Sequence, residues 1–178
     1  TGLDWPAFER AILETEPGNG GRLMLPYFVP EMTPKILKPE VRMFGDEEFV
    51  SYRDRAAVAR AIVEAQALGM QRYSAFIGET PSTILATGGA AKNRGILQVI
   101  ADVFQAEVRT LEVGNSSALG GALRAAQAIG KASWESLFER FAAPDGATRL
   151  SPNVAAVRAY APLRERFAAE VERLASVP

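Results

Sequence analysis

Hydrophobic residues recur every three or four positions over much of the chain, and this spacing predicts a helix-rich protein. The clearest apolar stripe runs through residues 56–73, where alanine-rich filler raises the helix propensity. Asp4 is expected to cap the first helix, with Pro6 in its first turn, and Pro162 to interrupt or kink the last helix. The predicted helices cover residues 4–14, 56–73, 94–104, 118–129, 134–141 and 153–174.

Two short apolar segments predict β-strands on either side of the helix at 94–104. Residues 82–86 form an apolar run that predicts a buried strand, and residues 107–113 alternate in a strand-like way. A turn and helix cap are expected at residues 114–117, which include Gly114. The order strand, glycine turn, helix, strand, turn and helix is typical of an α/β unit.

The segment at 22–52 is difficult to assign because prolines recur in it. Its apolar start, residues 23–29, is expected to be extended, irregular or an edge strand, since proline cannot donate to a central ladder. A long surface loop is the other interpretation of the whole segment. Few convincing strands are therefore visible for an α/β domain. Either the N-terminal third hides strands, or the sheet is completed by chain outside this sequence.

The composition narrows the chemistry of the protein. The 178 residues correspond to about one domain and contain no histidine and no cysteine. These absences exclude a Ser–His–Asp triad, a thiolate nucleophile and the common zinc sites. A formal net charge of −1 provides no electrostatic reason to expect binding to nucleic acid or to an anionic membrane. No apolar run is long enough to span a bilayer and no signal peptide is recognisable, so a cytoplasmic protein is expected.

Candidate binding residues cluster where the strand at 82–86 ends. The Walker A and Rossmann patterns are absent. Gly88 and Gly89 would let a ligand approach the backbone, and free N–H groups at the following helix would favour an anion or a polar sugar edge. A tight structural turn explains the two glycines equally well. Asn93 is suited to contact a purine edge or ribose, or simply to cap the helix, and Trp5 to stack on a base or to join the core.

The remaining charged residues have plain structural interpretations. Arg53, Asp54, Arg55 and Arg60 are most simply a solvated helix face. Asp102 lies between apolar helix positions, where a structural hydrogen bond is a simpler role than contact with a ligand. No two carboxylates are spaced as an acid/base pair.

Residues 84–104 and 115–122 resemble the adenosine motif and the following segment of the FGGY carbohydrate kinases, particularly the xylulose kinases of animals. The likeness also includes Trp5 and residues 16–21 and 30–34. It extends from about Trp5 to Gln127 with matching order and spacing, and the tail after Gly130 matches only loosely.

This resemblance implies an α/β fold of the actin-like (ribonuclease H-like) ATPase type, helix-rich with few strands. Residues 1–178 would be a single partial domain, the C-terminal part of the second, ATP-binding domain of such a kinase. The N-terminal sugar-binding domain and the general-base aspartate would lie outside this chain. Such a truncated sheet would expose an edge strand and an apolar face, so self-association is expected, with a homodimer as one form of it.

By the same resemblance, Gly89, Ala90 and Asn93 match nucleotide contacts of xylulose kinases, and Trp5 matches a tryptophan lying against adenine. Gly88 is added to this set because of its backbone position. The implied cofactors are ATP and Mg²⁺, and the implied reaction is transfer of the γ-phosphate to D-xylulose. This chain alone is predicted to be inactive. The alternatives are another FGGY kinase, acting on ribulose, glycerol or another polyol, and a non-catalytic nucleotide-binding module.

Overall fold

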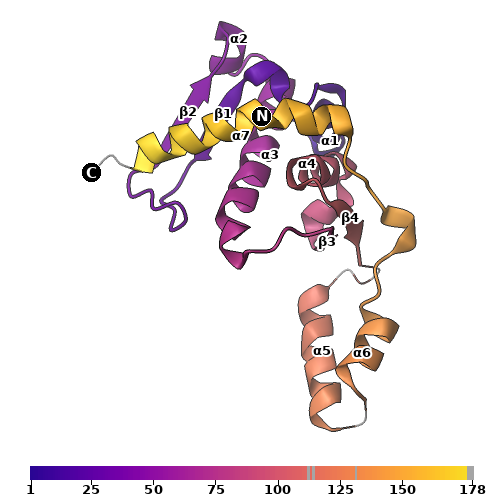
Figure 1. The fold of residues 1–178 in the computed structure, drawn as a ribbon. Helices are drawn as coiled ribbons and strands as arrows, with labels where there is room; N and C mark the ends of the chain where they lie inside the picture. The colour runs from indigo at the N-terminus through magenta and orange to yellow at the C-terminus, as the bar shows by residue number, and fades with distance from the viewer. Residues whose placement is uncertain (112, 114, 131, 176–178) are drawn as a thin grey trace.

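A computed structural model describes residues 1–111, 113, 115–130 and 132–175 (Figure 1). The strands are β1 (Leu23–Tyr27), β2 (Glu40–Phe44), β3 (Thr83–Ala86) and β4 (Glu107–Thr110). The helices are α1 (Trp5–Glu14), α2 (Glu47–Val50), α3 (Arg55–Ser74), α4 (Arg94–Phe104), α5 (Ser116–Ala128), α6 (Trp134–Phe141) and α7 (Val154–Ala175).

The helices predicted from hydrophobic spacing are all confirmed, with ends that shift by at most a few residues. Asp4 caps α1 by accepting a hydrogen bond from the Ala7 N–H at 2.8 Å. Of the interruption or kink expected at Pro162, the interruption is wrong, because α7 runs through this proline as one helix. Its buried face, which includes Tyr160, Leu163 and Phe167, packs into the main core, and this packing outweighs the loss of one backbone donor.

The proline-rich segment contains a β-hairpin and a short helix, so its interpretation as one long surface loop is wrong. β1 and β2 pair antiparallel, with Leu23 opposite Phe44 and Tyr27 opposite Glu40. Pro26 lies within β1, as the edge-strand expectation allows, because the described sheet has only these two strands. One face of the hairpin lies on the main core and the other on a smaller cluster around Phe49.

The second sheet pairs β3 with β4 in parallel, so that Thr83 lies opposite Glu107 and Ala86 opposite Thr110. β4 ends sooner than predicted, at Thr110, and Glu112 and Gly114 of the predicted strand and turn lie outside the described residues. A strand forms at Thr83–Ala86 as predicted, but the expectation that it is buried is wrong. Leu85 is 46 % exposed, because α4 covers one face of the pair and no described element covers the other.

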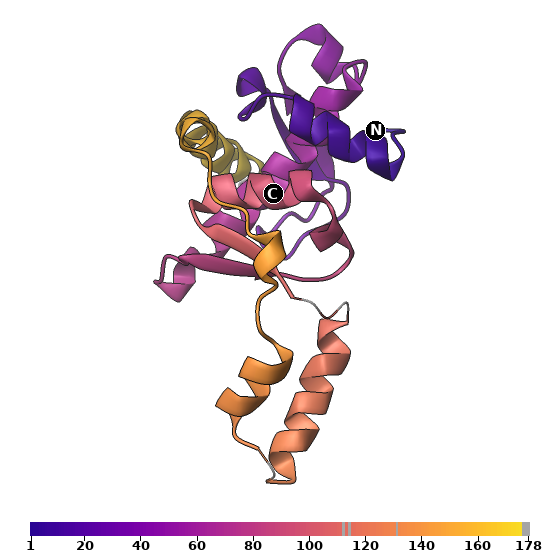
Figure 2. The same cartoon turned by 90° about the vertical axis from the view of Figure 1, so that its right-hand side faces the viewer.

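The main core lies around α3, which contacts α1, α4, α7 and β1. Two helices stand apart from it: α5 and α6 project away from the rest of the chain as a helical pair (Figures 1 and 2). Leu123 and Leu137 are the buried residues of this pair. None of the described helices is long and apolar enough to cross a membrane.

The expectation that Arg60 is solvated is wrong, since its side chain lies inside the main core. Its guanidinium donates to Glu64 Oε1 at 2.7 Å, to the Tyr160 hydroxyl at 2.8 Å and to the Thr15 carbonyl at 2.7 Å. It also donates to the carbonyl of Ile12. Burial raises the pKa of Glu64 despite the attraction of Arg60. This buried network ties the end of α1 to α3 and α7.

Candidate nucleotide-binding site

The candidate site lies at the carboxyl ends of β3 and β4. Ligands of open α/β sheets bind at this edge, because the loops that leave parallel strands meet there. The loop after β3 contains Thr87, and the segment after β4 leads to Ser116 at the start of α5. Their hydroxyl oxygens lie 2.7 Å apart, so the two loops are joined by a hydrogen bond.

The loop after β3 exposes its backbone and also turns tightly, so both interpretations of the two glycines stay open. Gly88 has φ of +90° and ψ of −171°, which only glycine adopts readily. A 3₁₀ turn, Gly89–Lys92, follows it. Within the described part of the chain, nothing accepts a hydrogen bond from the N–H groups of Gly89 and Ala90. A Cβ placed on Gly88 or Gly89 would meet no atom within 4 Å, so a ligand has room to reach this backbone.

Asn93 caps α4, which confirms its simpler interpretation. Its side-chain oxygen accepts a hydrogen bond from the Ile96 N–H at 3.0 Å. The residue is 0 % exposed, and its amide Nδ2 has no acceptor among the described residues. An unpaired buried donor costs about 1–3 kcal/mol. The amide is therefore a buried donor without a partner among the residues that the structure describes.

The start of α4 is not an open anion site, contrary to one expectation from the sequence. Glu9 of α1 accepts a hydrogen bond from the Arg94 N–H at 2.7 Å, and the Asn93 carbonyl accepts one from the Leu97 N–H. With the bond from Ile96, most of the free N–H groups of this helix end are used. The carboxylate of Glu9 would also repel a phosphate. The remaining donors, at Gly89 and Ala90, are better suited to a neutral polar edge.

Trp5 does not join the core, although an amphipathic helix favoured that interpretation. It is 51 % exposed, and its ring stacks on Phe8 with 5.7 Å between centroids and 8° between planes. Phe8 packs against the main core and supports the indole from one side. The indole is thus an accessible aromatic surface stacked on Phe8, which suits stacking on a base.

An apolar groove of about 690 Å³ begins at the loop after β3 and follows the free side of β3. It lies between that strand, α4 and the end of α3. Its exposed apolar side chains include Phe76, Ile77 and Leu85, which are 88 %, 61 % and 46 % exposed. Ala90 and Ala91 line the end of the groove at the candidate site. We name this feature the β3 groove.

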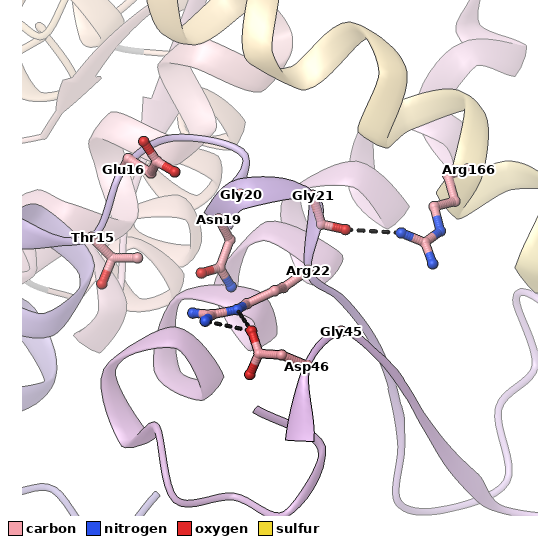
Figure 3. A pocket seen from close by; sticks show the side chains of 9 residues that line it. All are labelled: Thr15, Glu16, Asn19, Gly20, Gly21, Arg22, Gly45, Asp46 and Arg166. Carbon is pink, nitrogen blue, oxygen red and sulfur yellow. Dashed lines mark hydrogen bonds and ion pairs between the residues drawn. The ribbon is translucent and has the colours of Figure 1, made fainter. Parts of the chain in front are cut away.

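A second cavity, of about 540 Å³, lies beside the glycine turn at residues 18–21 (Figure 3). Arg22 points into it but already donates to Asp46 at 2.7 Å and to Asp54 at 2.9 Å. Arg166 donates to the Gly21 carbonyl at 2.9 Å. Because Arg22 is already paired with two carboxylates, we assign no phosphate contact to this cavity.

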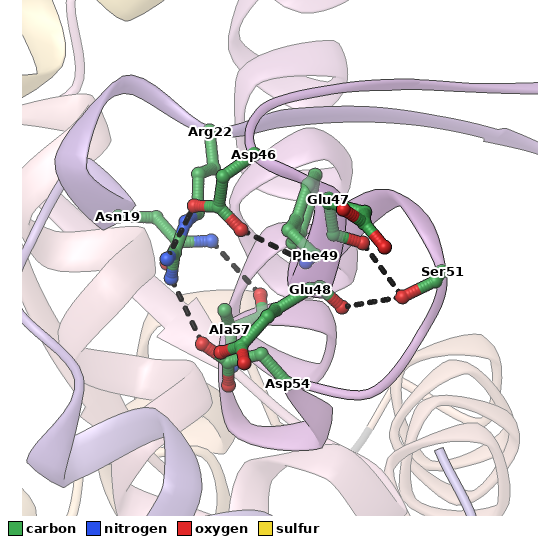
Figure 4. A network of polar contacts seen from close by, with 9 residues as sticks. All are labelled: Asn19, Arg22, Asp46, Glu47, Glu48, Phe49, Ser51, Asp54 and Ala57. Atoms are coloured by element: carbon green, nitrogen blue, oxygen red, sulfur yellow. Dashed lines mark hydrogen bonds and ion pairs between the residues drawn. The ribbon is translucent and has the colours of Figure 1, made fainter.

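Asp46 and Asp54, the carboxylates beside that cavity, have structural roles. Asp46 accepts from the Phe49 N–H at 3.0 Å, and Asp54 accepts from the Ala57 N–H at 2.9 Å, so they cap α2 and α3 (Figure 4). The Phe49 N–H and Arg22 hold the pKa of Asp46 below its usual value. Arg22 thus joins two helix starts to β1.

Asp102 has the structural role expected from its position in α4. Its carboxylate accepts from the Asn153 N–H at 2.7 Å and from Gln98 at 2.9 Å, which joins α4 to the start of α7. Burial raises the pKa of Asp102, and these two donors oppose the rise. Among the described residues there is no group of three or more acidic or metal-binding side chains that could hold a metal ion.

Glu9 is the residue of this region that the sequence did not reveal. It lies 85 positions before Arg94, and no motif connects the two. The only available signal was its place on α1, one helical turn after Trp5.

Comparison with known proteins supplies the context for this geometry. The model of the C-terminal domain of the FGGY family of carbohydrate kinases matches residues 4–129. Xylulose kinase of Rattus norvegicus is 35 % identical over 176 residues, which are 97 % of this chain and 33 % of the relative. The chain therefore spans about a third of the length of the curated relatives it matches.

Solved structures have the same fold. The ligand-bound xylulose kinase from Lactobacillus acidophilus matches with a TM-score of 0.81 and 23 % identity, over 96 % of this chain and 35 % of that one. The glycerol kinase of Plasmodium falciparum with ADP matches with a TM-score of 0.74 and 14 % identity, over 98 % and 34 % of the two chains. These kinases confirm the actin-like ATPase fold for this chain, in its helix-rich C-terminal form.

Proposed function

The chain belongs to the FGGY family of carbohydrate kinases, and we propose that it is the ATP-binding portion of an enzyme that phosphorylates D-xylulose. The enzyme would transfer the γ-phosphate of ATP to the sugar and release D-xylulose 5-phosphate. We choose D-xylulose as the substrate because this chain is 35 % identical to a xylulose kinase over 97 % of its length.

Within this chain, we assign the nucleotide to Trp5, Gly88, Gly89, Ala90 and Asn93. The unpaired N–H groups of Gly89 and Ala90 and the orphan amide of Asn93 fit the polar edges of adenosine. The exposed ring of Trp5 fits the adenine face. Since Glu9 occupies the start of α4, we assign the phosphates to residues outside this loop.

The rest of the catalytic machinery would come from the remainder of a longer protein. That part would supply the sugar site and an aspartate that takes the proton from the attacking hydroxyl. Mg²⁺ would neutralise charge on the transferring phosphoryl group, and we assign no residue of this chain to it. The sheet face opposite α4, where Leu85 is 46 % exposed, supports the view that residues 1–178 form a partial domain, because parallel sheets are normally covered on both faces.

The function is tested on the full-length protein with a panel of D-xylulose, ribulose, glycerol and other polyols. We expect ATP-dependent phosphorylation with the highest kcat/KM for D-xylulose. Preference for another polyol would retain the kinase and change its substrate. Nucleotide binding without phosphorylation of any sugar would favour the non-catalytic module.

Asn93→Ala in the full-length enzyme is expected to raise the KM for ATP by about tenfold, as loss of one buried hydrogen bond implies. The KM for D-xylulose should change much less, because Asn93 is assigned to the nucleotide. Steady-state kinetics with each substrate varied in turn measure both values.

The matched control for Asn93→Ala is Ser133→Ala, which removes the cap of α6, where Ser133 accepts from the Ser136 N–H at 3.3 Å. It should leave both KM values unchanged. A larger rise in the KM for D-xylulose than for ATP would contradict the role assigned to Asn93.

Trp5→Ala should weaken ATP binding by about tenfold, since stacking of a base on an aromatic ring contributes about 1–3 kcal/mol. Equilibrium titration of the full-length protein with ATP measures the Kd. Trp134→Ala is the control, because Trp134 is also partly exposed but lies on the projecting helix α6. Equal Kd values for the two variants would show that Trp5 does not contact the base.

A further inference from the structure

Helix α1 packs against α4, with Ile12 of α1 next to Gly95 in the first turn of α4. The contact is close: a Cβ placed on Gly95 would lie 3.0 Å from Cβ and Cγ2 of Ile12. Ile12 itself is 1 % exposed. A glycine at this point of α4 lets the two helices approach so closely, so the position of one helix depends on that of the other.

Glu9 supplies a polar bond at the same contact. Its Oε1 lies 2.7 Å from the Arg94 nitrogen. Arg94 is the first residue of α4 and directly follows Asn93, and its N–H is one of those that a helix leaves unpaired at its start. A carboxylate is favoured at this end by the helix dipole. Glu9 therefore holds α1 to the backbone that carries Asn93.

Trp5 lies four residues before Glu9, so the two side chains share one side of α1. The stacking on Phe8 restrains the indole against the same helix. At the other end of α1, Arg60 holds the carbonyls of Ile12 and Thr15. Any shift of α1 along α4 would consequently move Trp5 relative to Asn93.

We propose that Glu9 is a positioning residue for the nucleotide site. By its bond to the Arg94 N–H, it sets the distance between the aromatic surface of Trp5 and the polar groups of the loop after β3. The inference rests on the proposed function, because it requires that Trp5 and Asn93 contact the same nucleotide. Glu9 itself touches the helix start and not the ligand.

The test compares Glu9→Ala with Glu9→Gln in the full-length enzyme, with ATP and D-xylulose varied separately. Glu9→Ala removes the acceptor and should raise the KM for ATP by about five- to tenfold, with kcat and the KM for D-xylulose within about twofold of the original values. Glu9→Gln keeps an oxygen that accepts the Arg94 N–H and should restore the KM for ATP to within about twofold. Glu14→Ala, at the exposed end of the same helix, should change neither KM.

An unchanged KM for ATP in Glu9→Ala would overturn the proposal, and a lower melting temperature without that change would identify Glu9 as a structural cap alone. Equal effects on both KM values, or no rescue by Glu9→Gln, would overturn it as well. Comparison with Asn93→Ala and Trp5→Ala separates two failures. If those variants raise the KM for ATP and Glu9→Ala does not, only the role of Glu9 fails. If none of them does, the nucleotide site fails and the role of Glu9 with it.

Discussion

Arg60→Met should lower the free energy of unfolding by about 3–5 kcal/mol, as expected when one partner of a buried ion pair is removed. Arg60 is 4 % exposed and Glu64 is 1 % exposed, so water cannot replace the lost guanidinium. Glu64 would retain the Gly18 N–H at 2.9 Å and the Tyr160 hydroxyl at 2.9 Å, but no countercharge. The carbonyls of Ile12 and Thr15 would lose a shared donor as well.

Pulse proteolysis of the full-length protein across a urea series measures this loss. The control is Arg53→Met, the same substitution in the exposed ion pair with Glu47, whose side chains are 61 % and 88 % exposed. Exposed pairs contribute at most about 1 kcal/mol, so the control should unfold almost as the unaltered protein does. Equal midpoints for the two variants would show that the buried network does not stabilise the domain.

Helix positions were predictable because they depend on local spacing. Residues 94–104 have apolar side chains on one face, and the structure confirms a helix from Arg94 to Phe104. The same holds for α1, where both the cap at Asp4 and the proline in the first turn are local signals. The strand after α4 was also predicted, though β4 ends earlier than the alternation suggested.

The partners of charged side chains were not predictable, because they come from distant segments. Arg60 was placed on a solvated face, yet Tyr160 and the end of α1 enclose it, 100 and 45 residues away along the sequence. The role of Glu9 was not predicted for the same reason. Its bond to the Arg94 N–H means that the start of α4 is not an open anion site. The interpretation of Trp5 as a core residue was wrong, because hydrophobicity alone does not show which side of α1 is covered by the rest of the protein.

The loop with Gly88 and Gly89 was predictable in position but not in detail. The sequence located the loop after β3 from an apolar strand, two glycines and a helix, and the structure places it at the carboxyl edge of β3 and β4. The positive φ of Gly88 and the unpaired N–H groups of Gly89 and Ala90 depend on the three-dimensional arrangement of the chain. Whether they bind adenosine stays a prediction.

The 178-residue chain alone should phosphorylate no D-xylulose, whereas co-expression with the remainder of the protein should restore the activity. Phosphoryl transfer requires ATP, the sugar hydroxyl and a base in one arrangement, and we assign the sugar site and the base to the remainder. A coupled assay for ADP release, with and without the second polypeptide, measures the effect. Measurable phosphorylation by the isolated chain would contradict it.

We expect the second polypeptide to cover the β3 groove when the two parts reassemble, and this can be tested by a substitution in the groove. If the remainder covers the groove, a charge placed there must lose its solvent on reassembly, which is costly without a partner. Leu85→Lys should therefore abolish most of the restored activity and reduce self-association of the isolated chain in sedimentation. Leu37→Lys is the matched control, because Leu37 is 66 % exposed and lies outside the groove. Equal recovery with both variants would mean that the groove is not where the two parts of the enzyme meet, and the free side of β3 would then need another explanation.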